Sequence, residues 1–284
     1  MRKFSMAGAV CALGMMLLVS GCYAGGKNVV KPGKNYVTQK VSLTDIESIR
    51  SSSSVDVVYT QASGTPYAEI YAPDNVVPLI RVEQKGKGLH VGFKPNTSIS
   101  GRFKCEVRVY APEVTSFATS SSSDIMLAKG LKTRKDVSFR TSSSGDITAS
   151  SVECAALSLS ASSSGDIELN TARCSSAAID AGSAGDCTVK NMVCSGDVEA
   201  STSSSGDITL AGTCRNAVFS ASSAGDIYAK DLLAKDVKAE ASSAGDIECQ
   251  ASGVLSTSVS SAGSVRYKGE PARIEGKIKG VSKM

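Results

Sequence analysis

Residues 141–149 read Thr-Ser-Ser-Ser-Gly-Asp-Ile-Thr-Ala, and variants of this phrase recur through the last two-thirds of the 284-residue chain. If the aspartate is called position zero, successive copies are separated by 18 to 22 residues. A fixed period in this range is typical of stacked supersecondary units. The serine at −3, the glycine at −1 and the aspartate of the complete copies are Ser143, Gly145, Asp146, Ser163, Gly165, Asp166, Ser183, Gly185, Asp186, Ser204, Gly206, Asp207, Ser223, Gly225, Asp226, Ser243, Gly245 and Asp246.

Small or apolar residues occupy positions −9, −7, −5, +1 and +3 of each copy, and the residues between them are mostly polar. This alternation predicts two short strands per copy. Because so short a unit cannot bury a face alone, we expect each strand to pair in parallel with its equivalent one coil away, about 4.8 Å along the axis. The sequence therefore predicts an all-β, single-stranded parallel β-helix (β-solenoid) with about 20 residues per coil. A β-propeller is disfavoured because each blade needs about 40 residues.

The repeated turn suggests a role for each of its residues. Side chains alternate between the two faces of a strand, and counting from the buried positions places the −3 serine inward. We therefore expect its hydroxyl to join a buried hydrogen-bonded ladder. The glycine allows a tight bend or a positive φ. The aspartate is expected to accept hydrogen bonds from nearby backbone N–H groups. A row of calcium sites is the weaker alternative, because each coil brings only one carboxylate.

Four cysteines keep the same period, at Cys154, Cys174, Cys194 and Cys214. Cysteines stacked on neighbouring coils come close enough for a disulfide. Free cysteine is also among the most buried residue types. A buried ladder of small residues is favoured over disulfides, and both remain open. Zinc is disfavoured, because the chain has no Cys-x-x-Cys pair and its single histidine is His90.

The start of the chain is typical of a secretory signal: Arg2 and Lys3 precede an apolar run that ends at Val19. The following Ser-Gly-Cys resembles a bacterial lipobox, which predicts a signal peptide over 1–21 and a lipid on Cys22. An ordinary signal peptide is the alternative. Residues 22–35 are rich in Gly, Lys and Asn, and are predicted to form a flexible tether.

Residues 36–112 are predicted to be a β-rich capping part of the same solenoid, elaborated by hairpins. Turn signals separate six predicted strands, which span 36–41, 56–61, 67–72, 80–84, 89–93 and 105–110. An atypical end unit of this kind covers the open edge of a solenoid. The repetitive coils are predicted over 113–270, and 271–284 fit either a last strand or a tail.

Composition excludes several classes of function. Removing Arg2 and Lys3 with the signal lowers the formal net charge from +4 to +2, and no basic stripe is present, so nucleic-acid binding has little support. Tryptophan is absent. The acids recur once per coil, which is an architectural distribution and not a catalytic cluster. No phosphate-binding loop or Ser/His/Asp triad can be argued, and no catalytic residue, metal ligand or cofactor is assigned.

The order of the motifs resembles a known family. Ser-Val-Asp-Val-Val-Tyr at 54–59 is followed by Ala-Pro-Asp-Asn at 72–75 and Gly-Leu-His-Val at 88–91. Val-Arg-Val-Tyr-Ala-Pro at 107–112 and the Ser-Ser-Gly-Asp-Ile coils come after these. The chain resembles the putative auto-transporter adhesin, head GIN domain family. The resemblance implies a β-helical fold, an adhesin role and no defined catalytic residues.

These observations lead us to expect a non-catalytic binding or adhesion module. It would be exported and held by the lipid on Cys22 at the bacterial outer membrane or cell surface. Its partner would be a surface glycan or a protein. A structural or scaffolding role in the envelope is the alternative. A polysaccharide-active enzyme is disfavoured, because the chain lacks clustered carboxylates and has few aromatic side chains.

Overall fold

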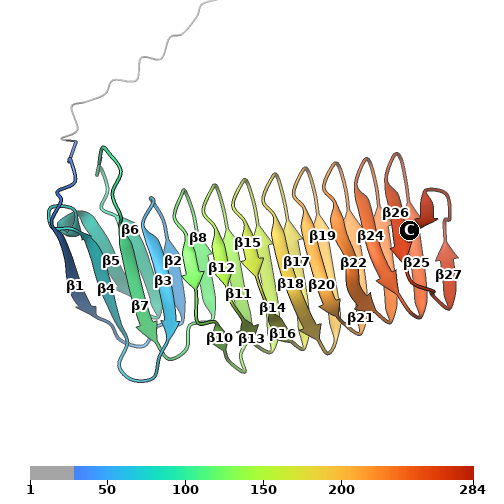
Figure 1. Ribbon diagram of the computed structural model, residues 1–284, viewed down its shortest axis with the longest axis horizontal. Helices are drawn as coiled ribbons and strands as arrows, with labels where there is room; N and C mark the ends of the chain where they lie inside the picture. The colour runs from blue at the N-terminus through green and yellow to red at the C-terminus, as the bar shows by residue number, and fades with distance from the viewer. Residues whose placement is uncertain (1–28) are drawn as a thin grey trace, which may run out of the picture.

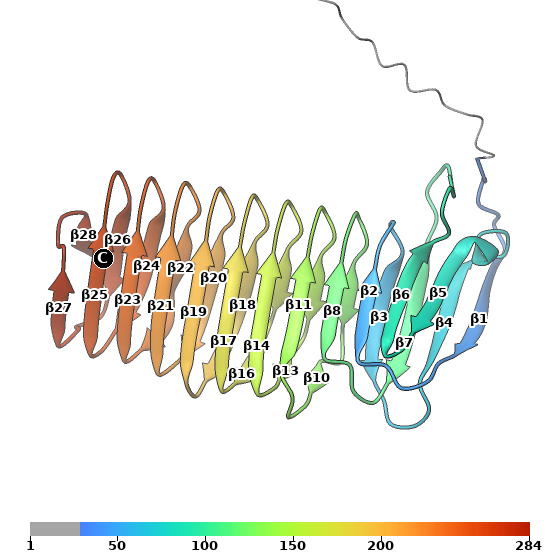
Figure 2. The ribbon, with the colours of Figure 1, turned by 180° about the vertical axis from the view of Figure 1, so that it is seen from behind.

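The computed structural model describes residues 29–284, which form an elongated rod made of two β-sheets (Figures 1 and 2). The signal segment and Cys22 lie outside the described residues. The chain winds through the rod so that each coil adds a strand to a twelve-strand sheet and then to a sixteen-strand sheet. One continuous core of buried side chains lies between the sheets and extends from Leu43 to Val265. The predicted β-solenoid is confirmed.

The register of the strands is set by the repeat. The +1 residues of consecutive coils are direct cross-strand neighbours in parallel pairs, as in Ile147 with Ile167 and Ile208 with Ile227. The full column is at most 1% exposed and consists of Ile125, Ile147, Ile167, Cys187, Ile208, Ile227, Ile247 and Val265. Slipping any strand by one residue would turn this column to solvent, which is why a period-two pattern specifies register strongly.

The twelve-strand sheet takes one regular strand from each coil. Its order is β27-β25-β23-β21-β19-β17-β14-β11-β8-β2-β6-β5, and every pair except β5–β6 is parallel. Its strands are β2 (Ser48–Ser51), β5 (Ile80–Lys85), β6 (Gly88–Phe93), β8 (Ser116–Thr119), β11 (Val137–Thr141), β14 (Ala156–Ala161), β17 (Ser176–Ala181), β19 (Asp197–Thr202), β21 (Asn216–Ala221), β23 (Asp236–Ala241), β25 (Val254–Val259) and β27 (Arg273–Gly276).

The sixteen-strand sheet is less regular. Its main path runs β1-β4-β7-β3-β9-β12-β15-β18-β20-β22-β24-β26-β28, and β10, β13 and β16 pair beside it. Its strands are β1 (Tyr36–Ser42), β3 (Asp56–Gln61), β4 (Tyr67–Pro73), β7 (Glu106–Ala111), β9 (Ile125–Leu127), β10 (Leu131–Lys132), β12 (Ile147–Ala149), β13 (Val152–Glu153), β15 (Ile167–Leu169), β16 (Ala172–Cys174), β18 (Cys187–Cys194), β20 (Ile208–Thr213), β22 (Ile227–Ala234), β24 (Asp246–Ala251), β26 (Ser264–Lys268) and β28 (Val281–Lys283).

The prediction of two strands per coil was incomplete. The early coils carry a third short strand, as in β13 and β16, and from β18 onward this strand merges with the one before it. The merged strands pair with a register shift, for example between Val189 and Met192. The third strand forms because a second pair of buried positions follows +3, occupied in β18 by Met192 and Cys194.

The N-terminal part caps the rod. The six predicted strands correspond to β1, β3, β4, β5, β6 and β7, with every boundary within one residue. Antiparallel pairing of β1 with β4, β4 with β7 and β5 with β6 closes this end, while β2 and β3 pair in parallel with β8 and β9 as a first coil. Two elements were not predicted, β2 and a short 3-10 helix, η1 (Val77–Leu79).

Both ends of the described chain are ordered against the rod. Residues 29–35 fall in the predicted flexible tether, but Val30 forms a β-bridge with Ile99. The Gly33 N–H donates to Asn75 Oδ1 at 2.8 Å, which holds the segment against the cap. At the other end, 271–284 contain two strands, β27 and β28.

Candidate binding surfaces of the solenoid

The repeated serines lie at the tip of each turn and not inside it. All eight −3 serines, including Ser121 and Ser261 of the two incomplete copies, are exposed and have φ between +57° and +67°. The predicted buried ladder of serine hydroxyls is therefore wrong. A ladder does exist, but it is made of backbone: the −2 N–H of each coil donates to the −3 carbonyl of the preceding coil, as from Ser164 to Ser143 at 2.8 Å. The −3 position turns the chain through a positive φ, which reverses the expected direction of its side chain.

The glycine at −1 allows the turns of neighbouring coils to pack closely against each other. Its φ is not positive at any copy, so the predicted positive φ belongs to the serine two residues earlier. A Cβ placed on Gly206 would lie 2.7 Å from the carbonyl oxygen of Gly185, its equivalent in the preceding coil. Gly225, Gly245 and Gly263 show the same approach to the preceding coil, at 2.7 to 3.0 Å. Only glycine lets the coils stack this closely at the turn.

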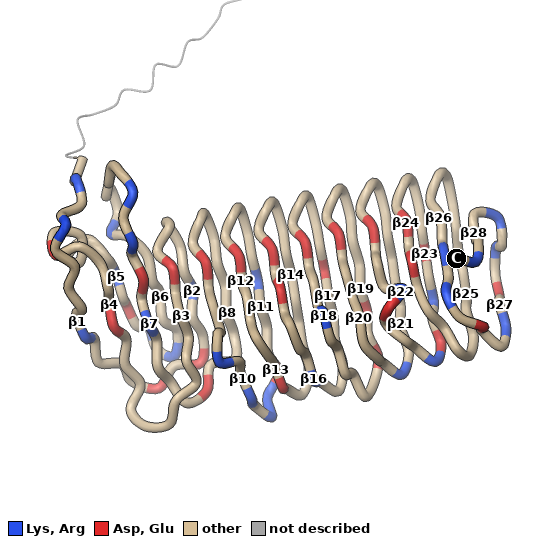
Figure 3. The backbone as a smooth tube through the Cα atoms, in the orientation of Figure 1, with Lys and Arg blue, Asp and Glu red and all other residues tan. Residues whose placement is uncertain are grey.

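The aspartates form a continuous ladder along one edge of the rod. Each carboxylate accepts a hydrogen bond from the backbone N–H of the aspartate one coil later, as Asp146 does from Asp166 at 2.9 Å. The ladder begins at Asp56 and ends at Asp246, which accepts from the Ser264 hydroxyl. Figure 3 shows these acids as a row of red segments that crosses successive coils. Their acceptor role follows the expectation, but the donor lies in the next coil instead of within the turn.

In this ladder, burial and the neighbouring carboxylates raise the pKa of three aspartates, while the bound N–H donors lower it. Partial burial is the largest effect and raises the pKa of Asp56, Asp166 and Asp207 above the usual aspartate range. The neighbouring carboxylates raise the same pKa values further, while the backbone N–H bonds lower them. Ionisation of these three groups therefore costs more in the folded chain than in the unfolded chain.

Buried hydroxyls occur at position −5, where three coils have a threonine that the sequence alone did not distinguish from the alanines of other coils. Thr119, Thr141 and Thr202 are at most 4% exposed. Thr141 Oγ1 donates to the carbonyl oxygen of Gly165 at 2.8 Å, and Thr119 Oγ1 donates to Ser123 O at 2.7 Å. A buried threonine thus satisfies the carbonyl of the position −1 residue.

The periodic cysteines form a column in the third strand. Cys174 and Cys194 are direct neighbours in the parallel pair of β16 and β18. Both are free thiols in this structure, as are Cys154 and Cys214. Burial raises the pKa of Cys154 to about 11 and that of Cys214 to about 12. The interaction between the two thiols lowers the pKa of Cys194 and raises that of Cys174. Cys154, Cys174 and Cys194 are buried, as the ladder of small residues requires, whereas Cys214 is half-buried. The Cys174–Cys194 pair is placed so that oxidation could join it.

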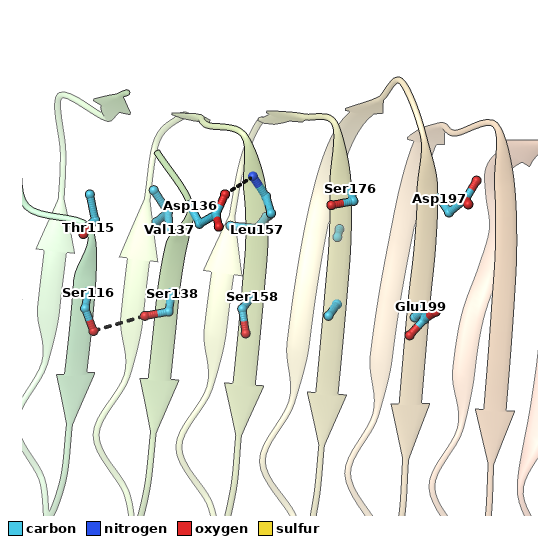
Figure 4. Close-up of a pocket in the computed structure, with 13 residues that line it drawn as sticks. Thr115, Ser116, Asp136, Val137, Ser138, Leu157, Ser158, Ser176, Asp197 and Glu199 are labelled. Atoms are coloured by element: carbon cyan, nitrogen blue, oxygen red, sulfur yellow. Dashed lines mark hydrogen bonds between the residues drawn. The ribbon is translucent and has the colours of Figure 1, made fainter. Parts of the chain in front are cut away.

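A shallow groove of about 600 Å³ crosses four coils on the outer face of the twelve-strand sheet (Figure 4). Its floor follows position −8, where Ser116, Ser138, Ser158 and Ala178 are successive cross-strand neighbours. The next coil has Glu199 in the groove wall. Small side chains in four consecutive coils therefore leave a trough, and a long acidic side chain closes one end of it.

The polar groups of the groove are mostly hydroxyls. Ser138 Oγ donates to Ser116 Oγ at 3.1 Å, while no hydrogen bond of the Ser158 side chain is recorded among residues 29–284. At the acidic end, Asp197 Oδ1 accepts from Arg215 Nη2 at 3.0 Å and from Asn216 Nδ2 at 2.9 Å. Serine hydroxyls can each donate one hydrogen bond and accept two. The groove thus offers neutral donors and acceptors at a regular spacing of about 4.8 Å.

Sequence reasoning missed this groove. The signal was available, because Ser116, Ser138, Ser158 and Ala178 share one position of the repeat, whereas the next three coils carry the larger Glu199, Val218 and Lys238 there. These outward positions differ in side-chain size from coil to coil, although most of them are polar.

Other candidate chemistry is dispersed. His90 lies half-buried in β6, where Arg50 and Glu83 are its cross-strand neighbours. Over residues 29–284, no three His, Cys, Asp or Glu side chains are arranged to hold a metal ion. The same part of the chain contains no helix with the length and apolarity of a membrane span.

The fold and its outer surfaces define a class of protein: a capped, single-stranded β-solenoid with a repeated Ser-Gly-Asp turn and a polar groove on one flat face. The chain belongs to the family described as "Putative auto-transporter adhesin, head GIN domain", whose model matches residues 45–200 and 171–271. This confirms the resemblance seen in the sequence. The family and the fold support an adhesion-like role at a surface, and the family's description names no enzymatic activity.

Solved structures of similar fold come from Parabacteroides species, among others. A "putative adhesin" from Parabacteroides distasonis matches with a TM-score of 0.65 at 21% identity, over 90% of this chain and 99% of that chain. A "putative adhesin" from Parabacteroides merdae matches with a TM-score of 0.64 at 20% identity, over 89% and 95%. A "putative lipid binding protein" from Parabacteroides distasonis matches with a TM-score of 0.61 at 22% identity, over 90% and 99%. Among curated proteins, no sequence matches this chain.

Proposed function

We propose that this protein is an exported lipoprotein that displays its solenoid as a non-catalytic adhesion module. Acylation of Cys22 would hold the chain on the bacterial outer membrane or cell surface. Each CH₂ buried in the bilayer contributes about 0.8 kcal/mol, so several acyl chains give stable anchoring. The groove on the twelve-strand sheet would then face a partner.

The observation that carries this proposal is the groove itself, together with the family to which the chain belongs. Four coils have small side chains at one outward position, so an extended partner can lie along the rod axis and reach the backbone of several strands. Hydroxyls spaced by one coil suit a partner with a repeating polar surface, and a linear glycan is the partner that we propose. Such contacts are weak singly and add up along the rod.

A glycan-array and cell-surface binding assay with the purified protein tests the groove. Ser158→Arg places a long side chain on the floor and should weaken binding about tenfold or more, which is a loss of about 1.4 kcal/mol. Ser256→Arg is the matched control, because Ser256 occupies the same outward position on β25, equally half-buried but outside the groove. Equal binding by both variants, with or without calcium, would remove the groove as the adhesion site.

The anchor is tested separately. Wild-type protein should partition into detergent and carry acyl chains on its N-terminal cysteine by mass spectrometry. Cys22→Ser should partition into water. An unmodified wild-type N-terminus would refute the lipoprotein assignment without affecting the groove.

A further inference from the structure

A second depression, of about 640 Å³, lies at the N-terminal end of the rod between the segment before β1 and the loop that joins β6 to β7. Three basic side chains line it, Lys31, Lys34 and Arg102, together with Tyr36 and Phe103. No acidic residue belongs to its lining. Figure 3 shows basic residues gathered on these two segments, next to the point at which the described chain begins.

The three cations are unpaired over the described range, 29–284. Each is exposed, and none has a carboxylate oxygen within 4.0 Å. Several other basic residues of the cap are paired, such as Lys104 and Arg108 with Glu106. Residues 1–28 contain no Asp or Glu, so they cannot supply a counter-ion. Three unpaired cations that line one depression without an acidic residue point to an external anion.

One carboxylate does lie beside the segment. A Cβ on Gly33 would be 3.2 Å from Asp74 Oδ1. Both Asp74 oxygens are already engaged, because Oδ2 accepts from Asn35 Nδ2 at 2.9 Å and Oδ1 accepts from the Asn75 N–H at 2.7 Å. Asp74 therefore holds the 33–35 segment in place, and the three cations remain available.

The chemistry of the depression suits a phosphate group at a membrane surface. A planar guanidinium with two ammonium groups provides several donors for phosphate oxygens. Tyrosine is enriched where protein meets the headgroup region of a bilayer, and Tyr36 and Phe103 supply aromatic surface beside the cations. Val29 is 53% exposed next to them and adds an apolar side chain.

The covalent geometry of the chain brings this depression to the membrane. Val29 lies seven residues after Cys22. Seven residues span at most about 25 Å when fully extended. If Cys22 carries the acyl chains, as the proposed function requires, the cap cannot lie farther than this from the lipid headgroups. Because a β-bridge to Ile99 holds Val30 against the cap, the depression lies within the same distance of the lipid headgroups.

We propose that Lys31, Lys34 and Arg102 bind phosphate groups of anionic phospholipids and dock the N-terminal cap on the bilayer. The rod then stands on its capped end, with the groove along its side and the C-terminal coils directed away from the bilayer. This inference rests on the proposed lipid anchor for its geometry, but the binding site itself consists of described residues only.

The test compares charge-reversal variants of the full chain on vesicles. Lys31→Glu/Lys34→Glu/Arg102→Glu removes the site. Lys235→Glu/Lys277→Glu/Lys279→Glu is the control, since these lysines are exposed, unpaired in the described range and distant from the cap. Both sets are placed on a Cys22→Ser background, which isolates the cap from the acyl chains. Circular dichroism and thermal melting confirm that all proteins fold.

The readout is co-sedimentation with vesicles of phosphatidylcholine containing phosphatidylglycerol. Each cation near an anionic surface changes partitioning about fivefold, so loss of three should lower it roughly a hundredfold. The control should retain wild-type partitioning. Equal loss by the control, or equal binding by the cap variant, would overturn the proposal. Stronger capture by a soluble sulfated polysaccharide than by vesicles, with the same sensitivity, would also overturn it.

Failure of the anchor and failure of the docking site are distinguishable. An unmodified Cys22 in the wild-type protein refutes the lipoprotein, whereas the vesicle assay never uses the acyl group. Binding of the Cys22→Ser protein through the three cations would uphold the phosphate site even in that case.

Discussion

Gly206→Ala is expected to destabilise the rod by about 2 kcal/mol, within the range of 1–3 kcal/mol typical of overpacking. The new methyl carbon would lie 2.7 Å from Gly185 O, 3.0 Å from Gly182 N and 3.1 Å from Ala181 C. All three are backbone atoms, so no side chain can rotate away. The turns must instead separate, which strains hydrogen bonds such as Ser205 N to Ser183 O, now 2.7 Å.

Urea unfolding followed by circular dichroism measures this change. A loss of 2 kcal/mol changes the folding equilibrium constant about thirtyfold and lowers the midpoint at an unchanged slope. Ser205→Ala is the matched control, because it adjoins Gly206, is exposed and is alanine in four other copies. A Gly206→Ala midpoint equal to that of Ser205→Ala would refute the packing role assigned to glycine.

Three further outcomes follow from the turn and the cysteine column. Ser223→Gly should leave stability unchanged or raise it, whereas Ser223→Val should lower it by about 1–2 kcal/mol, because φ is +64° at an exposed site; thermal melting compares the two. Asp166→Asn keeps the acceptor and removes the charge. Since the pKa of Asp166 is raised in the folded chain, the free energy of unfolding of the wild type should fall as the pH rises from about 3.8 through the raised value. In urea titrations, the variant should therefore be more stable than the wild type at pH 7 and equally stable near pH 3. Mild oxidation should join Cys174 to Cys194, which mass spectrometry of the unreduced protein detects; recovery of both as free thiols would contradict their placement as cross-strand neighbours.

Register and architecture were predictable because they depend on periodicity. A period of about twenty residues with alternating burial allows one parallel arrangement, and the pairing of Ile147 with Ile167 follows from it directly. The cap was predictable for a different reason: Gly, Pro and Asn mark its turns, so the strand boundaries could be placed within one residue.

The errors lie where backbone conformation breaks the alternation. Parity counted from Thr141 places Ser143 inward, but a positive φ at Ser143 reverses its side chain. Sequence alone gives no sign of this, because serine rarely adopts that conformation. The role of Gly145 was misjudged for the same reason, since a close approach between coils is a relation between turns and cannot be seen within one of them.

The candidate sites were less predictable than the fold. The groove requires comparing one outward position across coils, from Ser138 to Glu199, and then knowing that these positions share a face. The basic depression joins residues about 70 positions apart, Lys31 and Arg102, through a bridge that no local pattern indicates. Only the lipid anchor is purely a sequence feature, and it remains a prediction.

The aspartate ladder joins each coil to the next by the same bond, with the N–H of one repeat received by the carboxylate of its predecessor. If a duplication inserted one more repeat, its aspartate could accept from the N–H of the following coil, and its N–H could donate to the aspartate of the preceding coil. The molecule can thus change its length in steps of about 4.8 Å without a new interface having to evolve. The distance to which the rod extends from the cell could then change during evolution without a change in the surface that binds a partner.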